Sequence, residues 1–266
     1  MNLCIIGASG RMGKLVAAHA LESKDLKIVG AVESEASSNI GQDIGLFCGM
    51  NSIGVIIESN MLNASKNADV IIDFSGANGT EGNIESYKSL NIPMVIGSTG
   101  LKSSAVESLK ALSKNIPIVF SPNMSMGVNV LFKLTEIVAK VLESDFDIEI
   151  IESHHNKKKD APSGTAMKLA EIITSTLNLD LEKDVVYGRS GLTGERKKKE
   201  IGIHAVRGGD IVGEHIVMFC GNGEIIELTH KATSRSTFAM GALKASKWVY
   251  NKKPGLYSMF DVLGLK

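Results

Sequence analysis

The stretch CIIGASGRMGKLV, residues 4–16, decides the fold of the first half of this chain. It begins as a short apolar run, typical of a buried strand, and passes through a glycine-rich turn into a helical segment expected over 11–22. Gly7, Gly10 and Gly13 occupy the turn in the spacing G-x-x-G-x-x-G. Glycines there let the backbone turn tightly and approach a pyrophosphate, which the free N–H groups of a helix N-terminus stabilise. The stretch predicts a dinucleotide-binding turn.

Further buried strands and helices alternate up to about residue 120. The expected strands are LKIVGAV (26–32), ADVIIDF (68–74), IPMVIGS (92–98) and IPIVFSP (116–122), with helices expected over roughly 78–90 and 102–114. Strand, helix and strand in repetition imply a parallel sheet wound by right-handed crossovers. The fold class is therefore α/β, with an N-terminal Rossmann-type doubly wound parallel sheet.

The rhythm changes after Pro122, where a second, α+β domain is expected to begin. A long amphipathic helix is followed by a strand, a charged stretch, another helix, a basic loop and three alternating strand-like runs: IGIHAVRG (201–208), GEHIVMFC (213–220) and GEIIELTH (223–230). Such alternation favours a mixed or antiparallel sheet with one covered face. The expected domains are 1–123 for the dinucleotide, 124–234 for substrate and oligomerisation, and 235–266, a helix and tail that could pack back on the first.

Composition excludes several classes of partner. The 266 residues carry 29 basic and 29 acidic side chains, so no global charge points to nucleic acid or a membrane surface. Cys4, Cys48 and Cys220 are far apart and form no metal or redox pair, which favours reduced thiols in a cytoplasm. No apolar run approaches the ~20 residues of a membrane helix. We expect a soluble, cytoplasmic protein without a metal and without a cleaved leader.

An acidic residue marks the expected adenosine ribose site. Glu33 ends the second strand, twenty residues beyond Gly13, where a carboxylate accepts hydrogen bonds from ribose hydroxyls. Arg11, in the glycine turn, could meet the extra phosphate of NADP, but Ser34 provides no second cation. NADH is therefore favoured, with NADPH tolerated.

Two later strand ends are expected at the same edge of the sheet. Gly97, Ser98 and Thr99 follow the fifth strand and could approach a nicotinamide; the segment 121–124 follows the sixth and could form a hinge and a cleft wall. Taken singly each could be a plain turn, and only their shared edge favours a site.

The stretch ESHHNKKKDAPSGT, residues 152–165, concentrates ionisable groups. His154 and His155 should point to opposite faces if strand geometry persists, so at most one faces a given cleft. Histidine exchanges a proton near neutral pH, and a neighbouring lysine can hold an anion or donate a proton itself. The alternative is a solvated run of charge with partly buried histidines.

The turn PSGT then opens a helix. Ser163 or Thr165 can cap it, and the N–H groups around Gly164 and Thr165 form a small anion site. A substrate carrying carboxylates would suit this site; the alternative is a helix cap with no ligand.

Together these motifs resemble the dihydrodipicolinate reductase (4-hydroxy-tetrahydrodipicolinate reductase) family. ESHHNKKKDAPSGTA matches its signature of an acidic residue, a small residue, His-His, two spacers, Lys, one spacer and Asp-Ala-Pro-Ser-Gly-Thr-Ala. Other matches follow in order: GASGRMG, DFS, IGSTG, SPNMSMGVN, HAVRGGDIVGEH and HKATSRSTFAMGAL. The resemblance spans the whole chain.

The resemblance implies hydride transfer from NAD(P)H to a cyclic unsaturated dicarboxylate. The family reduces 4-hydroxy-tetrahydrodipicolinate to tetrahydrodipicolinate, with loss of water, in lysine and diaminopimelate biosynthesis. It also implies a homotetramer formed through the sheet of the second domain. Because cofactor and substrate motifs lie in different domains, we expect closure at a hinge.

Residue roles follow from the same resemblance. His154 is the catalytic proton donor or acceptor; Lys158, selected from the lysine triplet only by the family spacing, is a proton donor. The substrate contacts are His155, Gly164 and Thr165. The cofactor contacts are Gly7, Ala8, Ser9, Gly10, Arg11, Met12, Glu33, Gly97, Ser98, Thr99, Ser121, Pro122, Asn123 and Met124. Many relatives carry arginine where this chain has Ser34, which disfavours strong use of NADPH.

Rival functions lack their own residues. Sugar-type dehydrogenases of related architecture usually carry a lysine after the fifth strand, where this chain has Gly97-Ser98-Thr99. A semialdehyde dehydrogenase needs a nucleophilic cysteine in a motif, which none of the three cysteines has. A nucleotide-sensing regulator would not require the His-His-Lys-Ser-Gly-Thr constellation, and the chain offers no helix-turn-helix segment.

Overall fold

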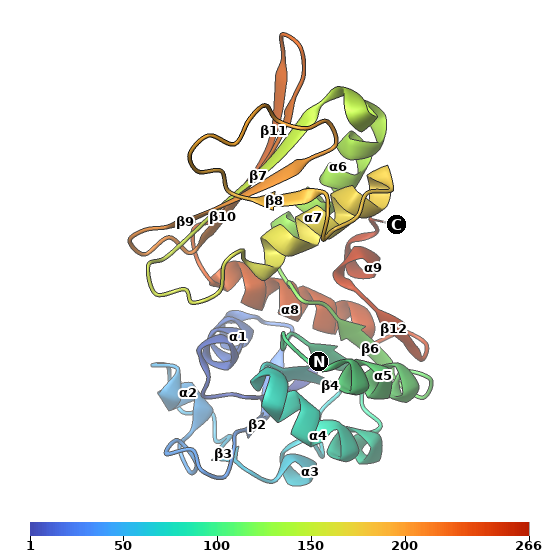
Figure 1. The fold of residues 1–266 in the computed structure, drawn as a ribbon. Helices are drawn as coiled ribbons and strands as arrows, with labels where there is room; N and C mark the ends of the chain where they lie inside the picture. Colours follow the sequence, from blue (N-terminus) through green and yellow to red (C-terminus); the bar gives the residue numbers. More distant parts are fainter. Residues whose placement is uncertain (266) are drawn as a thin grey trace. The chain divides into compact units, whose positions relative to one another are not determined.

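The computed structural model describes residues 1–265, except for the side chain of Ser144. These residues form two compact units (Figure 1). The first unit combines Met1–Met126 with the chain from Arg235 onward, and the second is Gly127–Ser234. The sequence prediction placed the first boundary at 123/124 and the second at 234/235.

The first unit is built on a seven-stranded sheet in the order β12-β6-β5-β4-β1-β2-β3. Its strands are β1 (Asn2–Ile6), β2 (Lys27–Val32), β3 (Ile57–Glu58), β4 (Val70–Asp73), β5 (Met94–Ile96), β6 (Pro117–Phe120) and β12 (Gly255–Tyr257). Every neighbouring pair is parallel. The winding reverses between β1 and β4, where open α/β sheets bind ligands. The predicted Rossmann-type doubly wound sheet is confirmed.

Helices cover both faces of this sheet. They are α1 (Arg11–Glu22), α2 (Ile44–Phe47), α3 (Met61–Ala64), α4 (Gly76–Leu90), α5 (Ser103–Leu112), α8 (Ser236–Val249) and α9 (Met259–Leu263). Leu3 and Ile5 of β1 lie in a buried cluster with residues of α1 and α8, whereas Cys4 and Ile6 lie in another with residues of α4 and α5. Successive strand residues point to opposite faces, so strands buried on both sides read as continuous apolar runs.

The C-terminal segment belongs to this first unit. Helix α8 packs against α1 and the central strands, and β12 extends the sheet by pairing with β6. Close packing requires glycine at one point of this segment: a Cβ on Gly241 would lie 1.8 Å from the carbonyl oxygen of Met124.

The second unit is built on a five-stranded sheet in the order β11-β10-β7-β9-β8. Its elements are α6 (Met126–Leu142), a 3₁₀ turn (Glu143–Asp145), β7 (Asp147–His154), α7 (Gly164–Leu177), β8 (Val185–Tyr187), β9 (Ile201–Arg207), β10 (Gly213–Cys220) and β11 (Ile225–Ala232). Strand β10 is antiparallel to β7 and β11, whereas β9 is parallel to β7 and β8. The sheet predicted as mixed or antiparallel is mixed.

Strand β7 alternates between a buried and a partly exposed face. Ile148, Ile150 and Glu152 are buried, whereas Glu149 and Ile151 are only partly so. The buried face packs against α7. A carboxylate at a position that otherwise holds isoleucines must find partners, because an unpaired buried charge is costly. Glu152 finds them at the carboxyl end of the strand.

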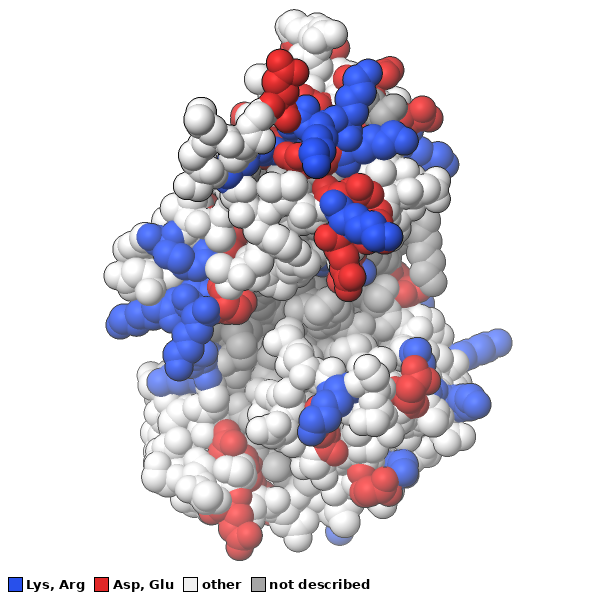
Figure 2. Space-filling view, viewed as in Figure 1, with Lys and Arg blue, Asp and Glu red and all other residues white. Residues whose placement is uncertain are grey.

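No helix among residues 1–265 is long and apolar enough to cross a membrane. On the face that Figure 2 draws, basic and acidic side chains both occur on each unit.

Candidate functional site

The centre of the site in the second unit is a pair formed by Glu152 and His154. Strand β7 continues through His154 instead of ending before it, so the two side chains lie two residues apart on one face of the sheet. Glu152 is fully buried, and 12 % of the His154 side chain is exposed. The Nδ1 atom of His154 lies 2.5 Å from Oε2 of Glu152. Strand geometry alone brings the carboxylate to the imidazole.

Arg207, the last residue of β9, completes this pair. The parallel register of β7 and β9 sets it beside His154. Its guanidinium donates from Nη1 to Oε2 of Glu152 at 2.8 Å and from Nη2 to Oε1 at 2.7 Å, and also reaches the carbonyl oxygen of Asp160 at 2.8 Å. Burial by itself raises the pKa of Glu152, but the hydrogen bonds from Arg207 and His154 lower it overall. The carboxylate is therefore ionised at neutral pH.

A second histidine, His215 on β10, lies against the first. The two ring centroids are 5.2 Å apart in an edge-to-face arrangement. His215 is only 4 % exposed, and burial lowers its pKa to about 3. Burial also lowers the pKa of His154, although its hydrogen bond to the Glu152 carboxylate opposes that shift. Both rings are therefore neutral in the ligand-free protein at pH 7.

The loop after β7 distinguishes one lysine from its neighbours. The Lys158 side chain is 19 % exposed and its Nζ pairs with both carboxylate oxygens of Asp160, at 2.8 and 3.0 Å, whereas Lys157 and Lys159 are exposed. Its backbone N–H donates to the carbonyl oxygen of His155. The Nδ1 atom of His155 is buried and has no hydrogen-bond partner among the described residues.

The N-terminus of α7 lies beside the same carboxylate. Ser163 is the residue that caps the helix: its Oγ accepts from the N–H of Ala166 at 3.2 Å. Its own N–H donates to Oε1 of Glu152 at 3.0 Å, and its Oγ lies 3.0 Å from Nε2 of His215. Gly164 is exposed, with open space where a Cβ would be. Such a helix start offers N–H groups to an anion.

In the first unit, the glycine turn fits a dinucleotide for steric reasons. Gly7 has a φ of +74°, and a Cβ there would lie 2.8 Å from the backbone of Phe74. A Cβ on Gly13 would lie 2.1 Å from the carbonyl oxygen of Gly7, so the turn and the helix can approach only without side chains. Around them Ala8 is buried and Arg11 is exposed at the start of α1.

Glu33 closes the other side of this turn. Its Oε2 accepts from the N–H and the Oγ of Ser9, at 3.0 and 2.7 Å. A cavity of about 650 Å³ extends from it, lined by Ile6, Gly7, Val32, Glu33, Ser34, Glu35, Ser59, Asn60, Met61, Leu62, Ser75, Gly79, Asn83 and Ser86. The cavity lies where β1 and β2 end, as expected for an adenosine site.

The predicted contacts after β5 lie against the segment that follows β4. Ser98 is 3 % exposed and accepts from the N–H of Gly76 at 3.0 Å, whereas Thr99 is exposed. A Cβ on Gly97 would lie 2.2 Å from the ring of Phe74.

After β6, the Oγ of Ser121 donates to the carbonyl oxygen of Asn123 at 3.0 Å. Ser121 and Met124 are buried, and Pro122 is exposed.

The structure thus gathers the predicted residues into two sets, one in each unit, and adds residues that sequence reasoning missed. His154, Arg207 and the N–H of Ser163 contact Glu152. His215 lies opposite Glu152 and against the ring of His154, and Lys158 pairs with Asp160 in the following loop. The segment HAVRGGDIVGEH was recognised as a family match, which was the available signal, but its arginine and last histidine received no role. Among residues 1–265, no group of three or more His, Cys, Asp or Glu side chains is placed to hold a metal ion.

Comparison with known proteins identifies the family over both units. Residues 1–124 match the family model for the dihydrodipicolinate reductase N-terminus, and residues 127–263 match the model for its C-terminus. A protein of Cupriavidus pinatubonensis named 4-hydroxy-tetrahydrodipicolinate reductase is 47 % identical over 266 residues, and one of Polynucleobacter necessarius with the same name is 46 % identical, each covering 100 % of both chains.

Solved structures agree at the level of the fold. A dipicolinate-bound dihydrodipicolinate reductase from Paenisporosarcina sp. TG-14 superposes with a TM-score of 0.75 at 23 % identity, covering 98 % of each chain. An amine dehydrogenase from Mycobacterium smegmatis has a TM-score of 0.62 at 13 % identity, covering 97 % of this chain and 95 % of its own. The predicted reductase family is confirmed by the sequence matches: the chain belongs to the dihydrodipicolinate reductase family.

Proposed function

We propose that this chain reduces 4-hydroxy-tetrahydrodipicolinate to tetrahydrodipicolinate, with loss of water, in lysine and diaminopimelate biosynthesis. The observation that carries the proposal is that His154 and the N-terminus of α7 both contact the buried Glu152, while Lys158 lies in the loop between them and lowers the pKa of His154. This arrangement combines groups that exchange a proton with groups that bind an anion, as an acceptor carrying two carboxylates requires.

The dinucleotide site is assigned to the first unit. NAD(P)H supplies the hydride. The glycine turn from Gly7 to Met12 would hold the pyrophosphate against the N-terminus of α1, and Glu33 would accept from the adenosine ribose. The segments Gly97–Thr99 and Ser121–Met124 would hold the nicotinamide end. The need for glycine at Gly7 and Gly13 supports this assignment.

The substrate site is assigned to the second unit. Gly164 and Thr165 would bind one carboxylate through the N-terminus of α7, and His155 would contact the ring. Lys158 would exchange its pairing with Asp160 for the anionic substrate or intermediate. The exposed Gly164 and the unpartnered Nδ1 of His155 support these roles.

Proton delivery is assigned to His154 or Lys158. Hydride addition leaves an electron-rich atom on the substrate, which must be protonated. His154 reaches the cationic form when the anionic substrate adds its charge to that of Glu152. Lys158 can donate directly, since its ammonium carries three donors.

NADH is proposed as the preferred coenzyme. Among residues 1–265, those that line the 650 Å³ cavity include Glu33 and Glu35 but no lysine or arginine. Two carboxylates repel the additional phosphate of NADPH and accept from a free ribose. We expect a kcat/KM ratio that favours NADH; replacing both glutamates with glutamine should lower that ratio.

A cytoplasmic homotetramer assembled through the sheet of the second unit is also proposed. Val206 on β9 and Ile225 on β11 are 47 % and 59 % exposed in the single chain, so association would remove apolar surface from water. Light scattering after size exclusion measures the mass; a monomer at micromolar concentration would contradict this assembly.

Hydride transfer requires the nicotinamide and the acceptor carbon to come into contact. We therefore propose closure at the hinge between the two units when both ligands bind. Small-angle scattering of free and doubly liganded protein tests this, and unchanged dimensions would count against it.

The reaction itself is tested by following absorbance of NADH and of NADPH while a coupled synthase generates the substrate. We expect turnover with at least one coenzyme and loss of the signal when the synthase is omitted. Absence of turnover with either coenzyme, in protein shown to be folded by circular dichroism, would overturn the assignment.

A further inference from the structure

We propose that Glu152, held by Arg207, is a positioning residue that fixes His154 in the Nδ1–H tautomer, so that Nε2 is the atom that exchanges the proton. The inference rests on the proposed reaction for its kinetic consequences. The tautomer itself is a property of the free protein and can be measured without substrate.

The hydrogen bonds of Glu152 determine which nitrogen of His154 carries hydrogen. Its two oxygens receive four contacts: Nη1 and Nη2 of Arg207, the N–H of Ser163, and Nδ1 of His154. Arginine and backbone N–H groups can only donate. The carboxylate is ionised beside the guanidinium, so it only accepts, and the 2.5 Å contact requires a hydrogen on Nδ1. In the neutral ring Nε2 therefore carries the lone pair.

The space at Nε2 supports its role as the exchanging atom. A Cβ added to Gly213, the first residue of β10, would lie 3.1 Å from Nε2 of His154. Glycine thus leaves that nitrogen uncovered by a side chain from the neighbouring strand. No hydrogen bond to Nε2 is present among residues 1–265, whereas Nδ1 is committed.

The ionisable groups around His154 act on its protonation in different directions. Glu152 of β7 favours the imidazolium, whereas Lys158 of the following loop and Arg207 of β9 disfavour it. His215 of β10 contacts the ring, and His230 faces His215 from β11. Burial lowers the pKa of both of these histidines. Asp160 is paired with Lys158. Glu152 is thus the anion in direct contact with the ring. Its loss would leave Lys158 and Arg207, which disfavour a positive charge, and Asp160, whose charge is paired with Lys158.

The same carboxylate also orients the anion site. Its Oε1 accepts from the N–H of Ser163, whose Oγ caps α7 immediately before Gly164 and Thr165. One buried group therefore sets both the imidazole and the turn that presents the helix N-terminus. Glu152→Gln would keep an oxygen for the N–H of Ser163 and for Nη2 of Arg207. Its NH₂ group would face Nδ1 of His154, which would then have to accept, and Nη1 of Arg207, which can only donate.

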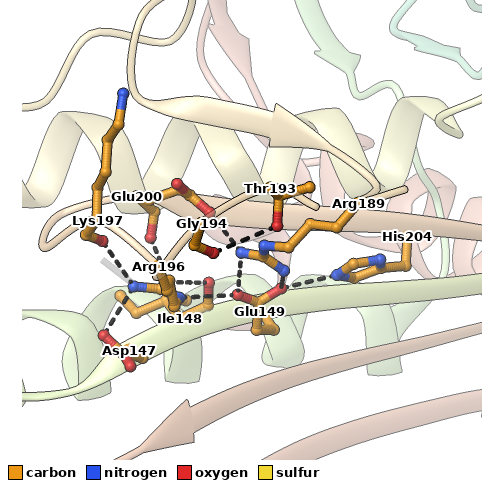
Figure 3. Close-up of polar contacts among 10 residues, drawn as sticks. All are labelled: Asp147, Ile148, Glu149, Arg189, Thr193, Gly194, Arg196, Lys197, Glu200 and His204. Carbon is orange, nitrogen blue, oxygen red and sulfur yellow. Dashed lines mark hydrogen bonds and ion pairs between the residues drawn. The ribbon is translucent and has the colours of Figure 1, made fainter. Parts of the chain in front are cut away.

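The chain contains a matched control on the same strand. Glu149, on the other face of β7, pairs with Arg189 at 2.8 and 3.0 Å, with Arg196 at 3.0 Å and with Nε2 of His204 at 2.7 Å (Figure 3). Glu149→Gln removes the same charge from a Glu–Arg–His cluster that has no place in the proposed reaction.

The test compares Glu152→Gln with Glu149→Gln by kinetics and by long-range ¹H–¹⁵N spectra of the histidine rings, with His154 assigned from the His154→Gln spectrum. For Glu152→Gln we expect kcat to fall about 10²–10³-fold with KM changed less than about threefold, since a wrong tautomer is costly in comparable dyads. The limb of the pH–rate profile that reports the titration of His154 should shift to lower pH in this variant. The neutral ring of His154 should then carry its hydrogen on Nε2. Glu149→Gln should keep kcat within about twofold of the parent. It should also leave the His154 tautomer and the pH profile of the rate unchanged.

A kcat within about threefold of the parent in folded Glu152→Gln, or an Nε2–H tautomer of His154 in the parent, would overturn the inference. The parent spectrum decides even where Glu152→Gln does not fold. Arg207→Lys keeps a cation beside the carboxylate and should retain the Nδ1–H tautomer with a smaller loss of kcat, about tenfold. If the parent shows no turnover with either coenzyme, the proposed function fails, while the tautomer result still stands or falls by itself.

Discussion

Strand β7 carries two Glu–Arg–His clusters three residues apart, on opposite faces. The Glu152 cluster contains Arg207 and His154; the Glu149 cluster contains Arg189, Arg196 and His204 and is drawn in Figure 3. Glu152 is fully buried, whereas 17 % of Glu149 is exposed. The histidines differ in the same direction, with 12 % of His154 and 34 % of His204 exposed.

The two clusters contain the same residue types, but their histidines contact the glutamates through different ring nitrogens. His204 offers Nε2 to its glutamate, while His154 offers Nδ1 and leaves Nε2 for another partner. Arg196 also donates to the carbonyl oxygens of Ile148 and Glu200, so the Glu149 cluster fastens the irregular segment 188–200 onto the sheet. The two Glu–Arg–His sets therefore differ in which ring nitrogen is bound to the glutamate: Nε2 in His204 and Nδ1 in His154.

The largest expected effect concerns the lysine attached to the Glu152 cluster. Lys158→Ala should lower kcat about 10²–10³-fold, because it removes a donor and a positive charge from the reacting region. Lys157→Ala and Lys159→Ala, on the same loop, should stay within about threefold. Steady-state rates of the three variants with the preferred coenzyme measure this. Equal losses from all three would mean that the loop contributes only a diffuse positive field.

A glycine-to-alanine substitution beside each cluster should lower kcat at the Glu152 cluster and stability at the Glu149 cluster. Gly213→Ala would place a Cβ 3.1 Å from Nε2 of His154, so kcat should fall about tenfold while stability changes little. Gly202→Ala would place one 1.8 Å from Oε2 of Glu149, which must move from its arginines. That variant should keep its kcat and lose about 1–3 kcal/mol in urea unfolding. The opposite pattern would reverse the roles of the two clusters.

Acid should destabilise the Glu149 cluster in a defined pH window. Burial by itself raises the pKa of Glu149, but hydrogen bonds from Arg189, His204 and Arg196 lower it to about 2. Because the folded-state pKa lies below the unfolded one, the stabilisation is complete above about pH 4.5 and is lost as pH falls toward 2. At pH 6 the free energy of unfolding of the parent should exceed that of Glu149→Gln by about 1–3 kcal/mol, a range that allows for the partial exposure of the cluster. If this difference in unfolding free energy were the same at pH 2, the ionised Glu149 carboxylate could not be its cause.

The smallest expected effect concerns the helix cap beside Glu152. Ser163→Ala removes the acceptor for the N–H of Ala166 and the hydroxyl group 3.0 Å from Nε2 of His215, and should cost about 1–2 kcal/mol of unfolding free energy. Ser163→Thr keeps a hydroxyl group and should recover most of it. Thermal unfolding with both variants at one pH gives the comparison, and an alanine variant as stable as the parent would show that the cap is not needed.

The sequence allowed the first unit to be predicted closely, since its strands are buried on both faces and its glycine turn has a steric cause. The expected helix 11–22 coincides with α1, whereas the one expected over 78–90 begins at Gly76. The strands β3, β8 and β12 were not predicted: each has two or three residues and, unlike the equally short β5, none was recognised as part of a longer apolar run.

The partners of Glu152 were less accessible to sequence reasoning. Arg207 lies 55 residues further along the chain and reaches Glu152 only through the parallel pairing of β7 with β9. His215 reaches the site through the antiparallel pairing of β10 with β7. Register between strands distant in sequence depends on the whole sheet, so a local motif could indicate the histidine but not the group that orients it.

The central claim is that His154 exchanges the proton, and chemical rescue tests it most directly. In His154→Gly, turnover of 4-hydroxy-tetrahydrodipicolinate should fall by at least about 10²-fold, and added imidazole should restore part of it in proportion to its concentration. The matched variant His204→Gly should have the turnover rate of the parent, and added imidazole should not change that rate. Turnover of His154→Gly within about threefold of the parent without imidazole would contradict the claim.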